Sequence, residues 1–135
     1  MNPIDHRVSI RKYQERPVEN EKILQILKAG MQAPSACNQQ PWEFYVVTDK
    51  EKIGLLSQTT PYAGCAAGAP VVIIPVYRTE SLPAPSMILI DMGLSLENIW
   101  LETDALGLGG VCIGISPVPE FMEPVCRILQ LPDNL

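Results

Sequence analysis

The chain has 135 residues, of which 47% are hydrophobic and 19% are charged, and its formal net charge is −5. This length and composition predict a single domain with a sizeable apolar core, and they exclude a disordered or low-complexity protein. The acidic balance argues against nucleic acid as a partner, because binding to a polyanion depends on a surplus of lysine and arginine.

The N-terminal segment is basic, although the whole chain is acidic. Four of the ten lysines and arginines stand within the first sixteen residues (Arg7, Arg11, Lys12 and Arg16). Arg7, Ser9 and Arg11 occupy alternate positions, and in an extended segment their side chains project to one side. Guanidinium groups bind phosphate through paired hydrogen bonds, and a serine hydroxyl adds a donor. The segment therefore indicates a phosphate site, with a solvated basic surface as the alternative.

The hydrophobic pattern predicts the elements of the first half of the chain. In order, these are a helix at Val18–Met31, a strand at Trp42–Thr48, a helix at Glu51–Ser57, a short helix or turn at Pro61–Ala69 and a strand at Val71–Tyr77. Pro75 inside the second strand indicates a sheet edge or a bulge, because proline cannot donate to a ladder.

The helix predicted at Met87–Leu106 is apolar on most sides. Its polar residues form a single narrow stripe, made by Asp91, Ser95, Asn98 and Glu102. A helix of this kind either runs through the centre of a domain or packs against a second subunit. The interrupting polar residues exclude a membrane span, and the first ten residues lack the apolar run of a signal peptide. A strand at Gly110–Ser116 and an amphipathic helix at Phe121–Leu131 are predicted to follow.

The cysteines and the single histidine limit the chemistry. Cys37, Cys65, Cys112 and Cys126 form no Cys-x-x-Cys pair and have no metal-ligand spacing. They are interpreted as reduced thiols, and the chain as cytoplasmic. With His6 as the only histidine, a multi-histidine metal site is excluded, and no serine-hydrolase elbow or Walker motif is present. No metal ligand and no catalytic side chain is therefore assigned.

A polar loop lies between two prolines within Ala33–Trp42 and carries Ser35, Asn38 and Gln39. Such a loop can present fixed donors and acceptors to a heterocyclic ligand. A connector between a helix and a strand, with its own local hydrogen bonds, is the simpler explanation when the loop is taken alone.

The segment Gly107–Gly114 is rich in glycine and superficially similar to a dinucleotide-binding fingerprint. Its glycines end a helix and open a strand, which is the reverse of that motif, so a Rossmann interpretation is rejected. Gly114 inside a predicted strand still indicates close approach of a ligand.

Three landmarks in this order resemble the FMN-dependent nitroreductase family. They are Arg7–Tyr13, Ala33–Trp42, and the helix with Asp91 and Asn98 that leads into Gly107–Gly114, and together they span nearly the whole chain. The resemblance implies an α+β fold of three layers, in which helices wrap a central, mostly antiparallel sheet and a buried central helix lies at the interface of a homodimer. The implied partners are NADH or NADPH and a small-molecule acceptor, with no nucleic acid and no membrane.

The resemblance also implies the residues that bind FMN. Arg7, Ser9 and Arg11 would hold its phosphate and ribityl chain, with the backbone amide of Val8 where the family often has a second arginine. Pro34, Ser35, Asn38 and Gln39 would approach the flavin from the partner subunit. Cys112, Ile113 and Gly114 would lie along the isoalloxazine ring.

The implied activity is that of an oxidoreductase, which passes hydride from NAD(P)H via flavin N5 to a nitroaromatic, quinone or similar acceptor by a ping-pong mechanism. Alternatives are a non-catalytic FMN carrier or sensor, another flavin reaction on the same scaffold (reductive dehalogenation or enone reduction), and an anion-binding module without flavin. Family members usually continue for a few tens of residues, adding a strand and a further arginine at the phosphate. Residues 1–135 are therefore expected to form one domain that lacks its C-terminal strand segment.

Overall fold

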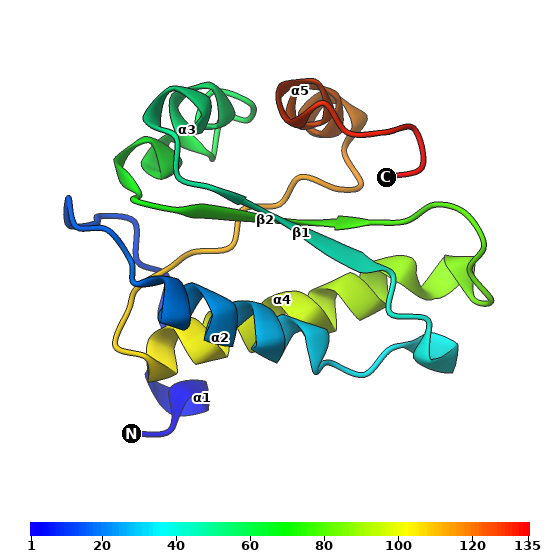
Figure 1. Cartoon of the computed structure of the whole chain (residues 1–135), viewed down its shortest axis with the longest axis horizontal. Helices are drawn as coiled ribbons and strands as arrows, with labels where there is room; N and C mark the ends of the chain where they lie inside the picture. The colour runs from blue at the N-terminus through cyan, green and yellow to red at the C-terminus, as the bar shows by residue number, and fades with distance from the viewer.

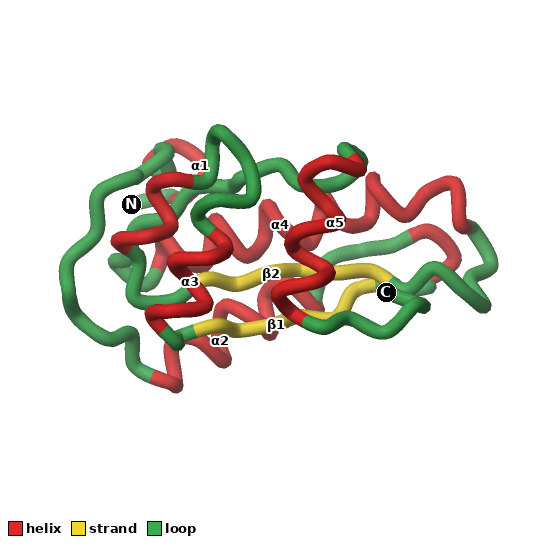
Figure 2. The backbone as a smooth tube through the Cα atoms, turned by 90° about the horizontal axis from the view of Figure 1, so that it is seen from above, coloured by secondary structure: helices red, strands yellow, loops and turns green.

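The computed structural model describes residues 1–135 and holds two strands between layers of helices (Figure 1). The α-helices are α1 (Pro3–His6), α2 (Asn20–Met31), α3 (Lys50–Leu56), α4 (Ile88–Ala105) and α5 (Pro119–Leu129), and the strands are β1 (Trp42–Val47) and β2 (Val72–Tyr77). Short 3₁₀ turns form η1 (Ala36–Asn38), η2 (Gly64–Gly68) and η3 (Pro85–Met87). Helices α3 and α5 lie on one face of the strands and α2 and α4 on the other, as the view from above in Figure 2 also shows.

The predicted α-helices and the first two predicted strands are present, with ends that differ by one or two residues from those expected. The final helix begins early, at Pro119, because proline at a first helical position removes no helical hydrogen bond. The short helix α1 has no apolar periodicity to predict it. It is stabilised by its cap, since the Asn2 side chain accepts the Ile4 N–H at 3.1 Å.

Strands β1 and β2 pair antiparallel over their full lengths. Just beyond them, the Arg78 N–H donates to the Pro41 carbonyl at 2.9 Å. Backbone groups alternate sides along a strand, so the even-numbered residues of β2, like Arg78, direct their backbone N–H and C=O groups to β1 and bond to it. The backbone groups of Ile73, Pro75 and Tyr77 point to the opposite edge of β2. No strand lies beside that edge, so Pro75 lies at a sheet edge, as the sequence pattern predicts.

The strand predicted at Gly110–Ser116 is wrong. This segment forms only an isolated parallel bridge, between Ser9 and Gly110. A cavity of about 950 Å³ lies between the segment and the free edge of β2 and is lined by both. The sequence pattern reports side-chain preference, whereas a strand also needs a neighbour within hydrogen-bond distance, and here the cavity separates the two backbones.

Helix α4 packs against α2 through its polar stripe. Ser95 Oγ donates to the Gly30 carbonyl at 2.9 Å, and Asn98 Nδ2 donates to the Ala29 carbonyl at 3.0 Å. The stripe therefore satisfies carbonyls in the last turn of α2. Other parts of α4 are less covered than expected, because Leu89, Ile90 and Leu94 are exposed in the single chain.

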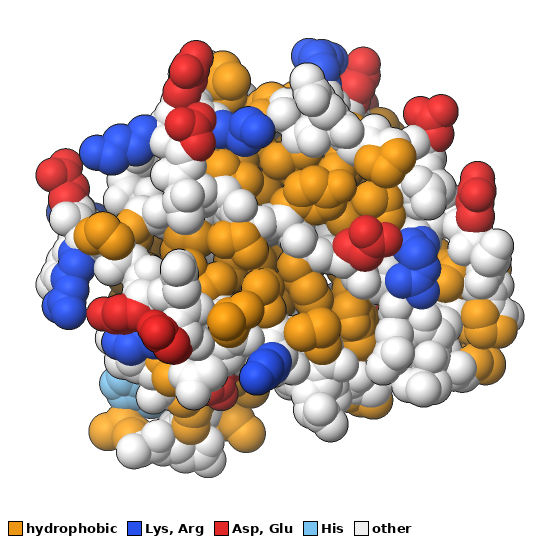
Figure 3. All heavy atoms as spheres, in the orientation of Figure 1, with side chains coloured by type: hydrophobic (Ala, Val, Ile, Leu, Met, Phe, Trp, Pro, Cys, Tyr) orange, Lys and Arg blue, Asp and Glu red, His pale blue; other side chains and the backbone are white.

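The main buried cluster lies on the α3 and α5 side of the sheet and contains Val47, Ile53, Leu56 and Val125. On the face drawn in Figure 3, apolar side chains form a band across the middle of the molecule, with charged side chains around it. Val46 of β1 is among the exposed apolar residues. None of the helices combines the length and the apolar character needed to cross a membrane.

Candidate functional site

The N-terminal segment that follows α1 lies beside residues 109–114. The Ile10 N–H donates to the Gly110 carbonyl at 2.9 Å, next to the bridge between Ser9 and Gly110. Gly109 permits this approach, because a Cβ at that position would stand 2.9 Å from Ile10 Cγ2. Trp100 Nε1 also donates to the Gly110 carbonyl, at 3.1 Å. The fold thus brings the basic segment and the glycine-rich segment together.

Arg7 and Arg11 have different surroundings. The guanidinium carbon of Arg7 lies 4.1 Å from the centroid of the Trp100 ring, and Arg7 Nε lies 3.8 Å from Glu97 Oε1. A cation–π contact and a nearby carboxylate therefore hold Arg7 against α4. Arg11 is exposed and forms no ion pair, which leaves its charge available to a ligand. Val8 and Ser9 are also exposed.

Arg11 shares a cavity of about 640 Å³ with the extended segment Val111–Gly114. The other lining residues are Tyr62, Cys65, Ser116, Val118 and Phe121. No backbone N–H or C=O of residues 111–114 takes part in a backbone hydrogen bond, although residues 111–113 are half-buried. Backbone groups removed from water need partners, so this segment offers unused donors and acceptors to a ligand.

The thiol of Cys112 is held in its neutral form. Burial raises the pKa of Cys112 above its ordinary value of 9.0, and the negative charge of Glu97 raises it further. Burial also raises the pKa of the Tyr13 phenol above 10.0; the charge of Cys65 adds to this increase and that of Arg11 opposes it. At neutral pH Cys112 is therefore a thiol and not a nucleophilic thiolate.

Raising the pH should destabilise the protein in a way that depends on Cys112. An acid whose pKa is raised by folding contributes stability that is fully present below its unfolded pKa and is lost as the pH rises toward its folded pKa. We expect the Tm to fall above about pH 9 and the fall to be smaller in Cys112→Ser. Thermal unfolding at several pH values checks this, with the exposed Cys37 as the matched Cys37→Ser control. An equal fall in both variants would contradict the prediction.

The proline-bracketed loop lies apart from the Arg11 cavity, and none of Pro34, Ser35, Asn38 and Gln39 lines it. Pro34 and Asn38 are exposed, and Ser35 is half-buried. Gln39 is buried, and both ends of its side-chain amide bond to groups of the same chain. Within one chain, the structure joins the first and third sequence landmarks and leaves the second outside their cavity.

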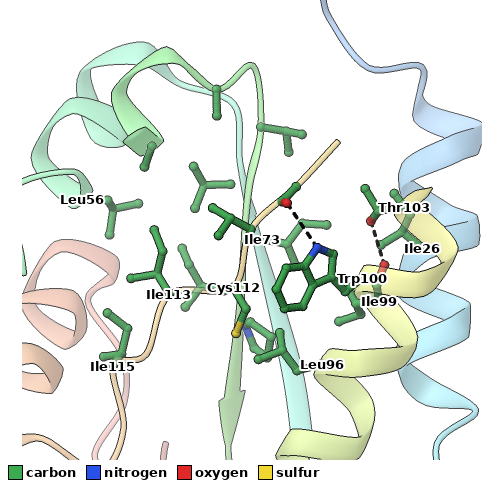
Figure 4. Close-up of a pocket in the computed structure, with 18 of the residues that line it drawn as sticks. Ile26, Leu56, Ile73, Leu96, Ile99, Trp100, Thr103, Cys112, Ile113 and Ile115 are labelled. Atoms are coloured by element: carbon green, nitrogen blue, oxygen red, sulfur yellow. Dashed lines mark hydrogen bonds between the residues drawn. The ribbon is translucent and has the colours of Figure 1, made fainter. Parts of the chain in front are cut away.

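The larger cavity, the one of about 950 Å³ that residues 110–116, β2 and α4 all line, is mostly apolar (Figure 4). Leu96, Ile99 and Trp100 of α4 face Ile73 of β2 across it, and Ile113 lies further along its wall. A phosphate would lose its hydration among such apolar groups without gaining hydrogen bonds from them. Of the cations that also line this cavity, Arg16 and Lys22 are paired with Glu19, and Lys12 is not. The cavity beside Arg11 is therefore the better candidate for an anionic ligand.

Sequence patterns do not predict three side chains of the candidate site, those of Tyr62, Cys65 and Phe121. They come from the segment before η2, from η2 itself and from the first turns of α5. Tyr62 is 75% exposed, which is unusual for a large aromatic side chain beside a cavity. An exposed tyrosine has no local sequence signature, so only the folded arrangement identifies it.

Comparisons with known proteins extend over the whole chain. The model of the nitroreductase family matches residues 4–62 and 55–135. A Methanothermobacter thermautotrophicus protein, provisionally named an NADH dehydrogenase/NAD(P)H nitroreductase, is 35% identical over 135 residues, which are 100% of this chain and 71% of that protein.

Solved structures give matches that agree with this family. A crystal structure from Clostridium acetobutylicum, provisionally named an NADH oxidase, has a TM-score of 0.95 and 42% identity, covering 98% of this chain and 80% of the other. An FMN-dependent nitroreductase from Clostridium difficile has a TM-score of 0.91 and 31% identity, covering 98% of this chain and 79% of the other. The predicted α+β fold, the predicted oxidoreductase class and the resemblance are confirmed by these matches. The chain belongs to the nitroreductase family.

Proposed function

We propose that this chain binds FMN and works as an NAD(P)H-dependent flavin oxidoreductase. The observation that carries the proposal is the cavity that exposed Arg11 shares with the unpaired backbone of residues 111–114. The names of its relatives support it, since one similar structure is an FMN-dependent nitroreductase and one relative is provisionally an NAD(P)H nitroreductase.

The residues present fit FMN. A phosphate requires a cation, and the Arg11 guanidinium provides one in a geometry that binds two oxygens. The edge of the isoalloxazine ring carries both donors and acceptors, which an unpaired extended backbone can match. The cavity volume of about 640 Å³ lies within the range of roughly 300–1,000 Å³ that is usual for ligands of this size. The proposed contacts are Arg11, Cys112, Ile113 and Gly114, which line this cavity, and the neighbouring Arg7, Val8 and Ser9, which lie outside it.

When bound, FMN supplies hydride transfer through N5, from NADH or NADPH to a nitroaromatic, quinone or similar acceptor in a ping-pong cycle. The residues of the chain bind and orient the cofactor. Arg11 compensates the phosphate charge, and the backbone of residues 111–114 fixes the ring edge. Cys112, kept protonated by burial and Glu97, places no negative charge beside the ring. No side chain is assigned a catalytic proton transfer.

We further propose a homodimer. Exposed apolar side chains of α4 supply the surface for it, namely Leu89, Ile90 and Leu94. Clustered exposed apolar residues often mark an interface. The loop that carries Pro34, Ser35, Asn38 and Gln39 would then approach the flavin of the second subunit, because it does not reach the cavity of its own chain. The four free cysteines suit a reducing compartment, so we propose a cytoplasmic location.

We also propose that residues 1–135 form one domain whose sheet takes a further strand between β2 and Gly110–Ser116. The edge of β2 that faces this space is unpaired. After Ile73, Pro75 and Tyr77, the next residue whose backbone points to this edge is Thr79, and its N–H donates to the Asn134 carbonyl at 2.9 Å. A strand running from this point along β2, through the cavity that Leu135 also lines, would be antiparallel to β2 and would pair its free groups.

Amide hydrogen exchange along β2 tests for this free edge. In the 135-residue chain, the N–H groups of Ile73 and Tyr77 point away from β1, whereas those of Ile74 and Val76 bond to it. We expect Ile73 and Tyr77 to exchange at least about tenfold faster than their even-numbered neighbours. Equally slow exchange at all four positions would show that the edge is already paired and would contradict the proposed place of the strand.

The proposed function is tested with purified protein, FMN and a nicotinamide nucleotide under anaerobic conditions. We expect bound flavin whose absorbance bleaches with NADH or NADPH and returns when a nitroaromatic or quinone is added. A protein that does not bind added FMN would overturn the proposal. A protein that binds FMN but is reduced by neither nucleotide would instead be a carrier or sensor.

A further inference from the structure

The loop Ser35–Gln40 has a backbone conformation that most residues do not adopt freely. Cys37, Asn38 and Gln40 have φ angles of 51°, 50° and 44°, which lie in the left-handed region. Only five non-glycine residues of the chain have positive φ, so this loop holds most of them. The region is unfavourable for residues with a side chain, least so for asparagine. Such strain persists only where surrounding groups fix it, and it concentrates at ligand sites.

Asp91 is the group that fixes the loop. It stands in the first turn of α4 and is 2% exposed. Its Oδ1 accepts the Ala36 N–H at 2.9 Å, and its Oδ2 accepts from Gln39 Nε2 at 2.6 Å. Both carboxylate oxygens are therefore bonded to the loop, and hydrogen bonds to a charged acceptor are stronger than neutral ones. The N-terminus of α4 also favours a negative charge at this place.

Gln39 extends this network to two other segments. Its side-chain amide donates to the Ala84 carbonyl at 2.9 Å and accepts the Ala84 N–H at 3.0 Å. Arg78 Nη2 donates to the Gln39 backbone carbonyl at 2.9 Å. The network turns Gln39 inward, while its neighbours Cys37 and Asn38 remain exposed. These hydrogen bonds thus hold together the loop Ser35–Gln40, the N-terminus of α4 and the end of β2.

We infer that Asp91 is a positioning residue, which through Ala36 and Gln39 sets the loop in the shape that presents Ser35 and Asn38 to the flavin of a second subunit. The inference rests on the proposed function. It also changes the role expected for Gln39, because the donors and the acceptor of its amide are used within the chain. Gln39 acts on the flavin through the loop and not by side-chain contact.

Asp91→Asn tests this role. The variant keeps the shape of the side chain, but its NH₂ group must face either the Ala36 N–H or the Gln39 NH₂ group, and both are donors. We expect the Kd for FMN to rise by about tenfold or more, and the Ala36 N–H to lose its protection against exchange.

Ser95→Ala is the matched control. Ser95 is a fully buried polar residue on the same helix, but its hydroxyl bonds to Gly30 of α2 and not to the loop. We expect it to leave the FMN affinity unchanged. Equal losses in both variants would reduce Asp91 to a general stabilising group and overturn the inference. Native affinity in Asp91→Asn would also overturn it while leaving the proposed function intact, whereas a native chain that binds no FMN would overturn both.

Discussion

Arg11→Ala is expected to lower the affinity for FMN by about 100-fold. A hydrogen bond to a charged group contributes about 1.5–3 kcal/mol, and about 1.4 kcal/mol corresponds to a factor of ten in Kd. Two such bonds to a phosphate therefore account for at least two factors of ten. Arg11 has no carboxylate partner in its own chain, so its full charge is available to the ligand. Titration of the protein with FMN, followed by flavin fluorescence, measures the change.

Two controls separate phosphate binding from general charge. Lys12→Ala removes the same charge one residue away, and Lys12 does not line the Arg11 cavity. We expect it to change the Kd by less than about threefold, the range of a screened surface charge. Riboflavin lacks the phosphate, so its affinity should be the same in Arg11→Ala and in the native chain. Equal losses from both substitutions, or a parallel loss for riboflavin, would contradict a phosphate role for Arg11.

Gly30→Ala is expected to lower the free energy of unfolding by about 1–2 kcal/mol, although alanine is the better helix former. Gly30 lies where α2 crosses α4, and a Cβ there would stand 2.9 Å from Ile99 Cγ1 and 3.1 Å from Phe44 Cζ. Overpacking of this kind costs about 1–3 kcal/mol, which exceeds the gain of about 0.5–1 kcal/mol from replacing a helical glycine. Denaturation in urea gives the difference between the variant and the native chain.

Gly54→Ala is the matched control for this packing argument. Gly54 is also inside a helix, α3, but a Cβ there would meet nothing within 4 Å. The same substitution should therefore stabilise the protein by about 0.5–1 kcal/mol. Opposite signs at the two positions would show that the close crossing of α2 and α4 sets the cost. Stabilisation by both substitutions would contradict the crossing geometry.

The helices could be predicted from sequence because their information is local. In α4, the spacing of Asp91, Ser95 and Asn98 predicts a single polar stripe, and all three side chains bond to α2 or to the loop before β1. The pattern does not say which surface the stripe meets. A helix at the centre of the domain and a helix at a second subunit fit the sequence equally well. Only the fold shows that Ser95 and Asn98 face α2 and that Asp91 faces the loop.

Pairing between distant segments is the part that sequence patterns could not predict. Residues 110–116 have the composition of a strand, yet they form only one bridge, because no neighbouring backbone lies within reach on the side of β2. The contact of Arg7 with Trp100 likewise depends on how α1 docks on α4. The alternation of Arg7, Ser9 and Arg11 predicts one anion site, whereas the fold places Arg7 on α4 and leaves Arg11 at the cavity.

The most direct test of the central claim is to follow the backbone amides of residues 111–114 by NMR while FMN is added to the native chain. These amides have no backbone hydrogen-bond partner in the structure. If they bind the ring edge, their signals should shift and their exchange with solvent should slow by at least about tenfold as the site fills. Binding of FMN with unchanged signals and exchange at all four positions would place the flavin elsewhere and contradict the account.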